Sequence, residues 1–201
     1  NRIDLKGFDF EFHFHDVEEL NKLAVLETYD ITKLSYFAAL GLEDKYTLLD
    51  SGGALGHNCG PLLICNSEIK EVSSDMTVAI PGKNTTANFL LSQAYPQLTN
   101  KTEVLFSEIE NEVLNMVYDL GLIIHESRFT YEQKGLKKVR DLGEYWEETT
   151  HSPIPLGAIA VSKKYGESLK SEIETLISES VKYSFAHPEV SRDFIKEYSQ
   201  E

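Results

Sequence analysis

The sequence predicts an α/β protein made of two units, and three observations support this fold class. Strand-like and helix-like segments alternate along the chain, which is typical of βαβ units with parallel strands. A polar stretch at residues 66–76 interrupts the alternation, and the same pattern then restarts. An apolar strand-like run returns at residues 154–161, ahead of a helical C-terminal part. Two α/β lobes, with the chain crossing between them twice, account for all three observations.

The first unit opens with alternating side chains. Residues 8–14 alternate aromatic and polar residues, and this period of two predicts a strand. Asp16 follows as the expected N-cap of a helix, with Glu19 three positions on as its capping-box partner. We expect the buried stripe of this helix to consist of Leu20, Leu23 and Ala24.

The rest of the first unit predicts short elements. A strand is expected at residues 31–34, followed by a helix that Ser35 caps and that ends near Leu42. Two more strands are expected at residues 46–49 and 62–65. The glycine-rich stretch between them lacks the spacing of a dinucleotide-binding loop and the lysine of an ATP-binding loop, so it reads as a flexible loop.

The second unit repeats strand, turn and helix, and the helical part follows. The expected elements are a strand at 77–80, a helix capped by Thr85 or Thr86 and ending near 95, a strand at 102–106, a helix that Ser107 caps and that ends near 118, and a strand at 120–124. After the strand at 154–161, apolar residues at helical spacing predict a helix over 168–185. Pro188 is expected to begin a final helix.

Charge and cysteine content narrow the classes of partner. Nineteen basic and 33 acidic residues give a net charge of −14, which disfavours binding to nucleic acid or to anionic membranes. An anionic substrate would therefore need a local cluster of donors. Cys59 and Cys65 match no zinc spacing, and they fit a reducing compartment better than a disulfide scaffold. We expect a cytoplasmic protein without a metal site.

Residues 121–131 (GLIIHESRFTY) form the most informative stretch of the chain. A short buried strand ends there in charged side chains, and ligands of open α/β sheets bind beyond the carboxyl ends of strands. His125 can titrate near neutral pH, so it can serve as a general base. Taken alone, these residues fit a surface histidine after a core strand slightly better.

Residues 85–87 (TTA) present a second candidate, because they begin a helix after a strand and a turn. Free N–H groups at a helix start favour an anion, and threonine hydroxyls add donors. Ordinary N-capping explains one threonine without any ligand. Ser35 leaves the same two alternatives open.

Six stretches taken in order resemble one family, the 1,4-dihydroxy-6-naphthoate synthases, lyases of the futalosine route to menaquinone. The resemblance extends from about Arg2 to Glu201. The matching stretches are 30–36 (DITKLSY), 59–63 (CGPLL), 79–82 (AIPG) with 85–87, 121–131, 141–149 (DLGEYWEET) and 153–157 (PIPLG).

The resemblance implies a two-lobed, periplasmic-binding-protein-like type II fold with two crossover strands. The crossings would lie near residues 62–66 and 159–163 and act as a hinge that closes the lobes over a ligand. Lobe 1 would then hold residues 1–66 plus 160–201, and lobe 2 residues 67–159.

The resemblance also implies a reaction and roles for particular residues. The substrate would be cyclic dehypoxanthine futalosine, a carboxylate, and the product 1,4-dihydroxy-6-naphthoate. His125 would be the general base, and Ser35, Thr86 and Ala87 would hold the substrate. No metal or organic cofactor is expected, and the protein could form a homodimer.

Three charged residues fall in matching stretches without a settled role. Asp30 and Lys33 fit surface charges on the residues alone. Arg128 fits equally well an ion pair with Glu126 or Glu132 and a role in orienting the base or the substrate.

One departure and two rival functions remain. Family members begin with a strand and a Cys-Pro-Asn-Asp-Thr segment that helps line the pocket, and nothing in this sequence matches it, so we expect part of the site to lie outside this sequence. The rivals are a chorismate dehydratase-like sister enzyme, in which the IIHE run is not expected, and a non-catalytic solute-binding protein or sensor of the same fold.

Overall fold

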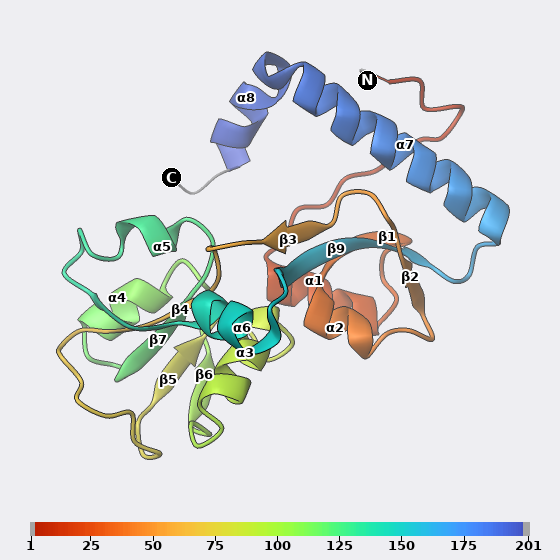
Figure 1. Cartoon of the computed structure of the whole chain (residues 1–201). Helices are drawn as coiled ribbons and strands as arrows, with labels where there is room; N and C mark the ends of the chain where they lie inside the picture. Colours follow the sequence, from red (N-terminus) through yellow and green to blue (C-terminus); the bar gives the residue numbers. More distant parts are fainter. Residues whose placement is uncertain (1–2, 199–201) are drawn as a thin grey trace.

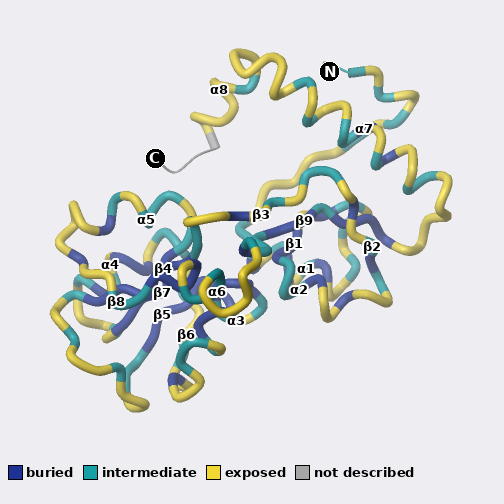
Figure 2. The backbone as a smooth tube through the Cα atoms, viewed as in Figure 1, coloured by how far each residue is buried: buried dark blue, intermediate teal, exposed yellow. Residues whose placement is uncertain are grey.

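The computed structural model describes residues 3–198, which form two β-sheets with helices on both faces of each (Figure 1). Buried residues concentrate in the two sheets, whereas the end of the long C-terminal helix and the helix after it are largely exposed (Figure 2). Among the described helices, none combines the length and the apolar character needed to cross a membrane.

The first sheet is built around a single central strand, to which all its other strands are antiparallel. Its strands are β9 (Ile154–Ser162) in the centre, with β1 (Ile31–Ser35), β2 (Tyr46–Leu48) and β3 (Ala54–Gly56). Its helices are α1 (Val17–Val25) and α2 (Tyr36–Leu40) on one face, and α7 (Glu167–Ala186) on the other, continued by α8 (Pro188–Tyr198). Successive side chains of β9 lie on opposite faces of the sheet. Ala160 packs with α1 and α2, and Val161 packs with α7.

The second sheet is mixed, with the strand order β6-β5-β7-β4-β8. Its strands are β4 (Leu62–Cys65), β5 (Val78–Ile80), β6 (Lys101–Glu103), β7 (Leu120–Ile123) and β8 (Lys137–Asp141). Its helices are α3 (Thr86–Ala94) and α6 (Leu142–Thr150) on one face, and α4 (Ile109–Leu114) and α5 (Ser127–Thr130) on the other. Alternate residues of β4 enter the cores on the two faces, which explains why all four of its residues are buried.

The chain passes between the sheets in two short segments, residues 57–61 and 151–153. The passages were expected near 62–66 and 159–163, but residues 62–65 are already paired within the second sheet and residues 159–162 within the first. The expected lobe limits therefore fall just after β4 and inside β9. Whether the two halves move as rigid bodies stays a prediction.

Residues 8–14 do not form the expected strand, although their alternation is visible locally. The rings of Phe8 and Phe10 lie 5.9 Å apart, and those of Phe10 and Phe12 lie 6.3 Å apart, so the aromatic side chains gather along one side of an extended segment. Within the described residues, this segment pairs with neither sheet. A period of two indicates which side chains share a face of an extended segment. A strand also needs a neighbouring strand for its backbone hydrogen bonds, and the period contains no information about that neighbour.

Several other expectations need correction. The strands of the first sheet are antiparallel, and among the described strands parallel pairing is confined to β5 with β6 and β7. Ser107 does not cap α4, which begins after Glu108 without a side-chain cap. The glycine-rich loop contains β3, and the polar strand β8 was not expected from the sequence. The buried stripe of α1 consists of Glu18, Asn21 and Ala24, so of the expected residues only Ala24 is buried, whereas Leu20 and Leu23 are half-buried. The remaining strands and long helices are present, and the caps Asp16, Ser35 and Thr85 are confirmed.

We predict that Gly121→Ala lowers the free energy of unfolding by about 1–3 kcal/mol, the usual cost of overpacking a core. A Cβ at this position of β7 would lie 2.7 Å from Val113 Cγ2 and 2.8 Å from Ile109 Cγ2, both on α4. The matched control is Gly166→Ala, where a Cβ would meet nothing within 4 Å. Urea denaturation measures both variants, and equal stability of the two would contradict the packing argument.

Candidate active site

A cavity of about 220 Å³ is lined by residues from both halves of the structure. Both sheets and the first passage between them contribute to its wall. The lining includes five of the residues singled out from sequence: Ser35, Thr86, Ala87, His125 and Arg128. The other lining residues are Val17, Cys59, Gly60, Pro61, Thr85, Ile124, Phe129 and Leu156.

A larger cavity, of about 490 Å³, lies elsewhere, between the extended N-terminal segment, β1 and α7. Its wall is mostly apolar and contains Lys33 but none of the other residues proposed for chemistry. The smaller cavity, in which polar and titratable groups converge, is therefore the better candidate for an active site.

His125 lies in the turn after β7, one residue beyond the end of the strand, and adopts a left-handed backbone with φ of 57°. Its ring meets the ring of Phe106 edge-on, with centroids 5.3 Å apart. His125 is exposed as a residue, yet desolvation by the groups around its ring lowers the pKa of His125 below its ordinary value. The charge of Glu126 raises this pKa and that of Lys33 lowers it. The lowered pKa favours the neutral imidazole, which is the form that a general base needs.

The start of α3 is organised so that one threonine caps the helix and the next faces the cavity. Thr85 Oγ1 accepts a hydrogen bond from Asn88 N at 3.2 Å and donates one to Gly82 O at 2.8 Å. Within the described residues, the N–H groups of Thr86 and Ala87 have no acceptor. The helix start therefore offers two open donors to an anion in the cavity.

The Thr86 hydroxyl bridges the two sheets. It accepts a hydrogen bond from Phe37 N and donates one to Leu156 O, both at the long distance of 3.4 Å. Ser35 caps α2, as expected, by accepting from Ala38 N, and its hydroxyl lies 2.7 Å from Asn84 O, to which it donates. Both hydroxyls thus line the cavity and also join its two walls.

Arg128 pairs with neither of the glutamates that flank it in sequence. Its guanidinium donates to Asp141 Oδ2 at 2.8 Å and to Gly60 O at 2.7 Å. Asp141 also caps α6 by accepting from Gly143 N and Glu144 N. The Arg128 side chain therefore ties α5 to α6 and to the passage that forms part of the cavity wall.

Two candidates lie outside the cavity. Asp30 is at the opposite end of β1 from Ser35, where a hydrogen bond to its carboxylate raises the pKa of Tyr165. Lys33 is exposed and acts on the site only through its charge, which lowers the pKa of His125. Among the described residues, no three His, Cys, Asp or Glu side chains gather as a metal site would require.

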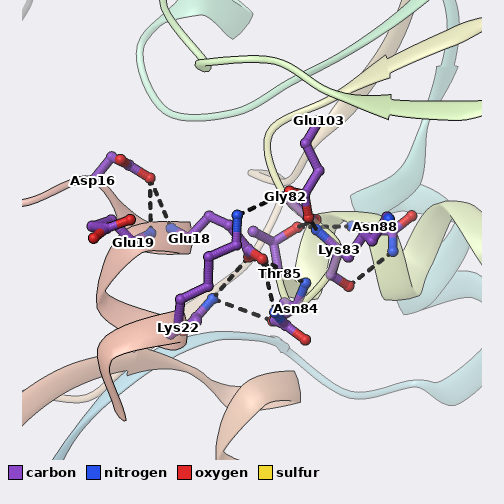
Figure 3. A network of polar contacts seen from close by, with 11 residues as sticks. Asp16, Glu18, Glu19, Lys22, Gly82, Lys83, Asn84, Thr85, Asn88 and Glu103 are labelled. Carbon is purple, nitrogen blue, oxygen red and sulfur yellow. Dashed lines mark hydrogen bonds and ion pairs between the residues drawn. The ribbon is translucent and has the colours of Figure 1, made fainter. Parts of the chain in front are cut away.

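Sequence reasoning missed a polar cluster at the contact between α1 and the loop before α3 (Figure 3). Glu18 Oε1 accepts from Asn84 Nδ2 at 2.8 Å, and Glu18 Oε2 accepts from Asn84 N at 3.1 Å. Asn21 Nδ2 donates to Asn84 O at 3.3 Å, and its Oδ1 accepts from Ser35 N at 3.1 Å. Glu18 is 4% exposed and Asn21 is 1% exposed. Two polar residues three positions apart on α1 were the available signal.

An ion pair lies beside this cluster. Lys22 Nζ lies 2.9 Å from Glu103 Oε2, and Glu103 Oε1 accepts from Lys83 N at 3.0 Å. The hydrogen bond to Glu103 raises the pKa of Lys22, and that from Lys22 lowers the pKa of Glu103. Both side chains are partly exposed, so the pair contributes little to stability.

The architecture defines a class of protein before any particular family. Two α/β sheets joined by two short passages, with a cavity between them, form a periplasmic-binding-protein-like type II fold. A substrate-binding protein of an amino acid ABC transporter shares this fold, with a TM-score of 0.60 and 14% identity over 95% of this chain and 82% of that one.

Within this class, the chain belongs to the menaquinone biosynthesis family, whose sequence model matches residues 2–201. It is 44% identical to the 1,4-dihydroxy-6-naphthoate synthase of Thermus thermophilus, over 92% of this chain and 68% of the relative. The Streptomyces coelicolor synthase is 37% identical over 94% of this chain and 68% of its own length. A crystal structure of an Archaeoglobus fulgidus protein superposes with a TM-score of 0.87 at 34% identity, over 92% of this chain and 69% of that one.

We predict that His125 titrates below the ordinary histidine value of 6.5. Removing either of the two charges that act on His125 should shift its pKa, and the two shifts should have opposite signs. Lys33→Gln should raise the pKa of His125, because it removes a positive charge, and Glu126→Gln should lower it further. An NMR titration of the imidazole C–H signals measures all three proteins. Shifts of the same sign in both variants would contradict this electrostatic account.

Proposed function

We propose that this chain is a carbon–carbon lyase that converts cyclic dehypoxanthine futalosine into 1,4-dihydroxy-6-naphthoate, with His125 as general base. Family membership and the two named relatives support an enzyme of menaquinone biosynthesis. The observation that carries the finer proposal is the cavity, in which a neutral imidazole and the open N–H groups of Thr86 and Ala87 line the same space. We further propose that the reaction takes place in the cytoplasm, consistent with two free cysteines.

The proposed reaction requires few catalytic groups from the protein. Loss of the sugar-derived fragment requires removal of a proton beside an electron-withdrawing carbonyl, and the ring then becomes aromatic. A neutral His125 accepts that proton, and aromatisation supplies driving force. The carboxylate of the substrate is held by the start of α3, whose donors act locally against the overall charge of −14.

The first test removes the base. His125→Asn should lower kcat by about 10²–10⁴-fold, the usual contribution of a positioned acid–base group, while the circular dichroism spectrum stays unchanged. His187→Asn, at the exposed end of α7, is the matched control and should retain full activity. The assay follows naphthoate formation from the cyclic substrate. Near-normal turnover by His125→Asn would remove His125 from this role.

The second test removes a donor to the substrate carboxylate. Thr86→Val keeps the shape of the side chain but loses the hydroxyl, and KM should rise by roughly 10-fold or more, as for a hydrogen bond to a charged group. Thr86→Ser restores the hydroxyl and should recover most of the affinity. If Thr86→Val binds substrate as the unaltered protein does, the threonine only joins the two sheets.

A further inference from the structure

The cavity described above is small for the molecule that it would accept. Its volume of about 220 Å³ lies below the roughly 300–1,000 Å³ of sites for drug-sized ligands. Entry of such a ligand requires its two walls to separate. The contacts that join the walls then have to break on entry and form again on closure, so their position decides how the closed site is assembled.

Three polar groups of Asn84 form hydrogen bonds with residues of the first sheet and of its helix α1. Its N–H and its side-chain amide donate to Glu18, and its carbonyl accepts from Asn21 and Ser35. Gly82 leaves room for this contact, because a Cβ there would overlap the Glu18 carboxylate. Asn84 stands two residues before Thr86, so fixing its backbone also fixes the start of α3.

Burial of the Glu18 carboxylate at this position costs free energy, because the charged group loses its contact with water. Within the described residues, no basic side chain lies within ion-pair distance of it, since Lys22 is paired with Glu103. Burial raises the pKa of Glu18, and the hydrogen bonds from Asn21 and Asn84 only partly offset the effect. An apolar side chain would satisfy a purely structural role of α1 at lower cost.

We propose that Glu18 is a positioning residue. Its carboxylate joins α1 to Asn84 by hydrogen bonds to the backbone and the side chain of Asn84. This contact holds the Thr86–Ala87 helix start against Ser35 when the cavity closes. The assignment of Thr86 and Ala87 as carboxylate donors rests on the proposed function; the fastening of the two walls does not. Glu18 acts through Asn84 and does not line the cavity.

The hydrogen-bond pattern allows an exchange test. Asn84→Asp places two carboxylates against each other and should drive the walls apart. Adding Glu18→Gln to it exchanges donor and acceptor, because the glutamine amide can donate to the new carboxylate while its oxygen still accepts from the backbone N–H of residue 84. Glu18→Ala removes the contact outright. Glu19→Ala, next along α1 with an exposed side chain, is the matched control.

The first readout is the separation of the two sheets in the full chain without ligand. Spin labels on ketone-bearing amino acids at Glu43, between α2 and β2 of the first sheet, and at Glu71, between β4 and β5 of the second, report this distance by pulsed electron resonance, and both positions are exposed. Glu18→Ala and Asn84→Asp should give longer, broader distance distributions. The double variant and Glu19→Ala should match the unaltered protein. Unchanged distances in Glu18→Ala and Asn84→Asp, or failure of the exchange to restore them, would overturn the proposal.

The second readout is binding of the naphthoate product by calorimetry. Affinity should fall by about 10–100-fold in Glu18→Ala and Asn84→Asp, as expected for charge-assisted hydrogen bonds, and return in the double variant. If the unaltered protein neither binds the naphthoate nor turns over the cyclic substrate, the proposed function fails, while the distances still decide the role of Glu18. If Glu18→Ala does not fold, Asn84→Asp and the double variant decide the question.

Discussion

The first sheet depends on a single strand, because β1, β2 and β3 all take their backbone hydrogen bonds from β9. This pairing also positions the cavity. The register places Ser35 opposite Gly157, next to Leu156, so the last residue of β1 reaches the cavity wall. A slip by one residue would move every side chain of β1 to the other face of the sheet. The same register puts Asp30 at the remote end of the strand.

The cavity combines two requirements that usually oppose each other, removal of water and retention of polar groups. Desolvation lowers the pKa of His125, and the helix start of α3 retains donors that no protein group uses within the described residues. Net charge alone would repel an anion from this chain. Open N–H groups in a partly enclosed space reverse that preference locally, because their attraction is strongest where water is excluded.

Long-range polar contacts hold the walls of this space in place. Arg128 reaches Asp141 and the Gly60 carbonyl, and the α1 residues reach Asn84. Gly60 also lies so close to α6 that a Cβ there would come within 2.7 Å of Gly143 Cα. The passage between the sheets is thus fixed by backbone contact on one side and a guanidinium on the other. The geometry of the site is set by segments that are distant in sequence.

The sequence by itself determined the features that depend on interactions between residues close together in the chain. The caps Asp16, Ser35 and Thr85 bond to groups two or three residues away, and the buried strands follow from their apolar runs, so both could be read without the fold. The six matching stretches likewise indicated the family, His125 and the start of α3. Only the tertiary structure decided strand direction, the lack of a sheet partner for residues 8–14, the pairing of Arg128 with Asp141, and the burial of Glu18 against Asn84. Each of these depends on which distant segment arrives beside a residue, and periodicity and propensity carry no information about that neighbour.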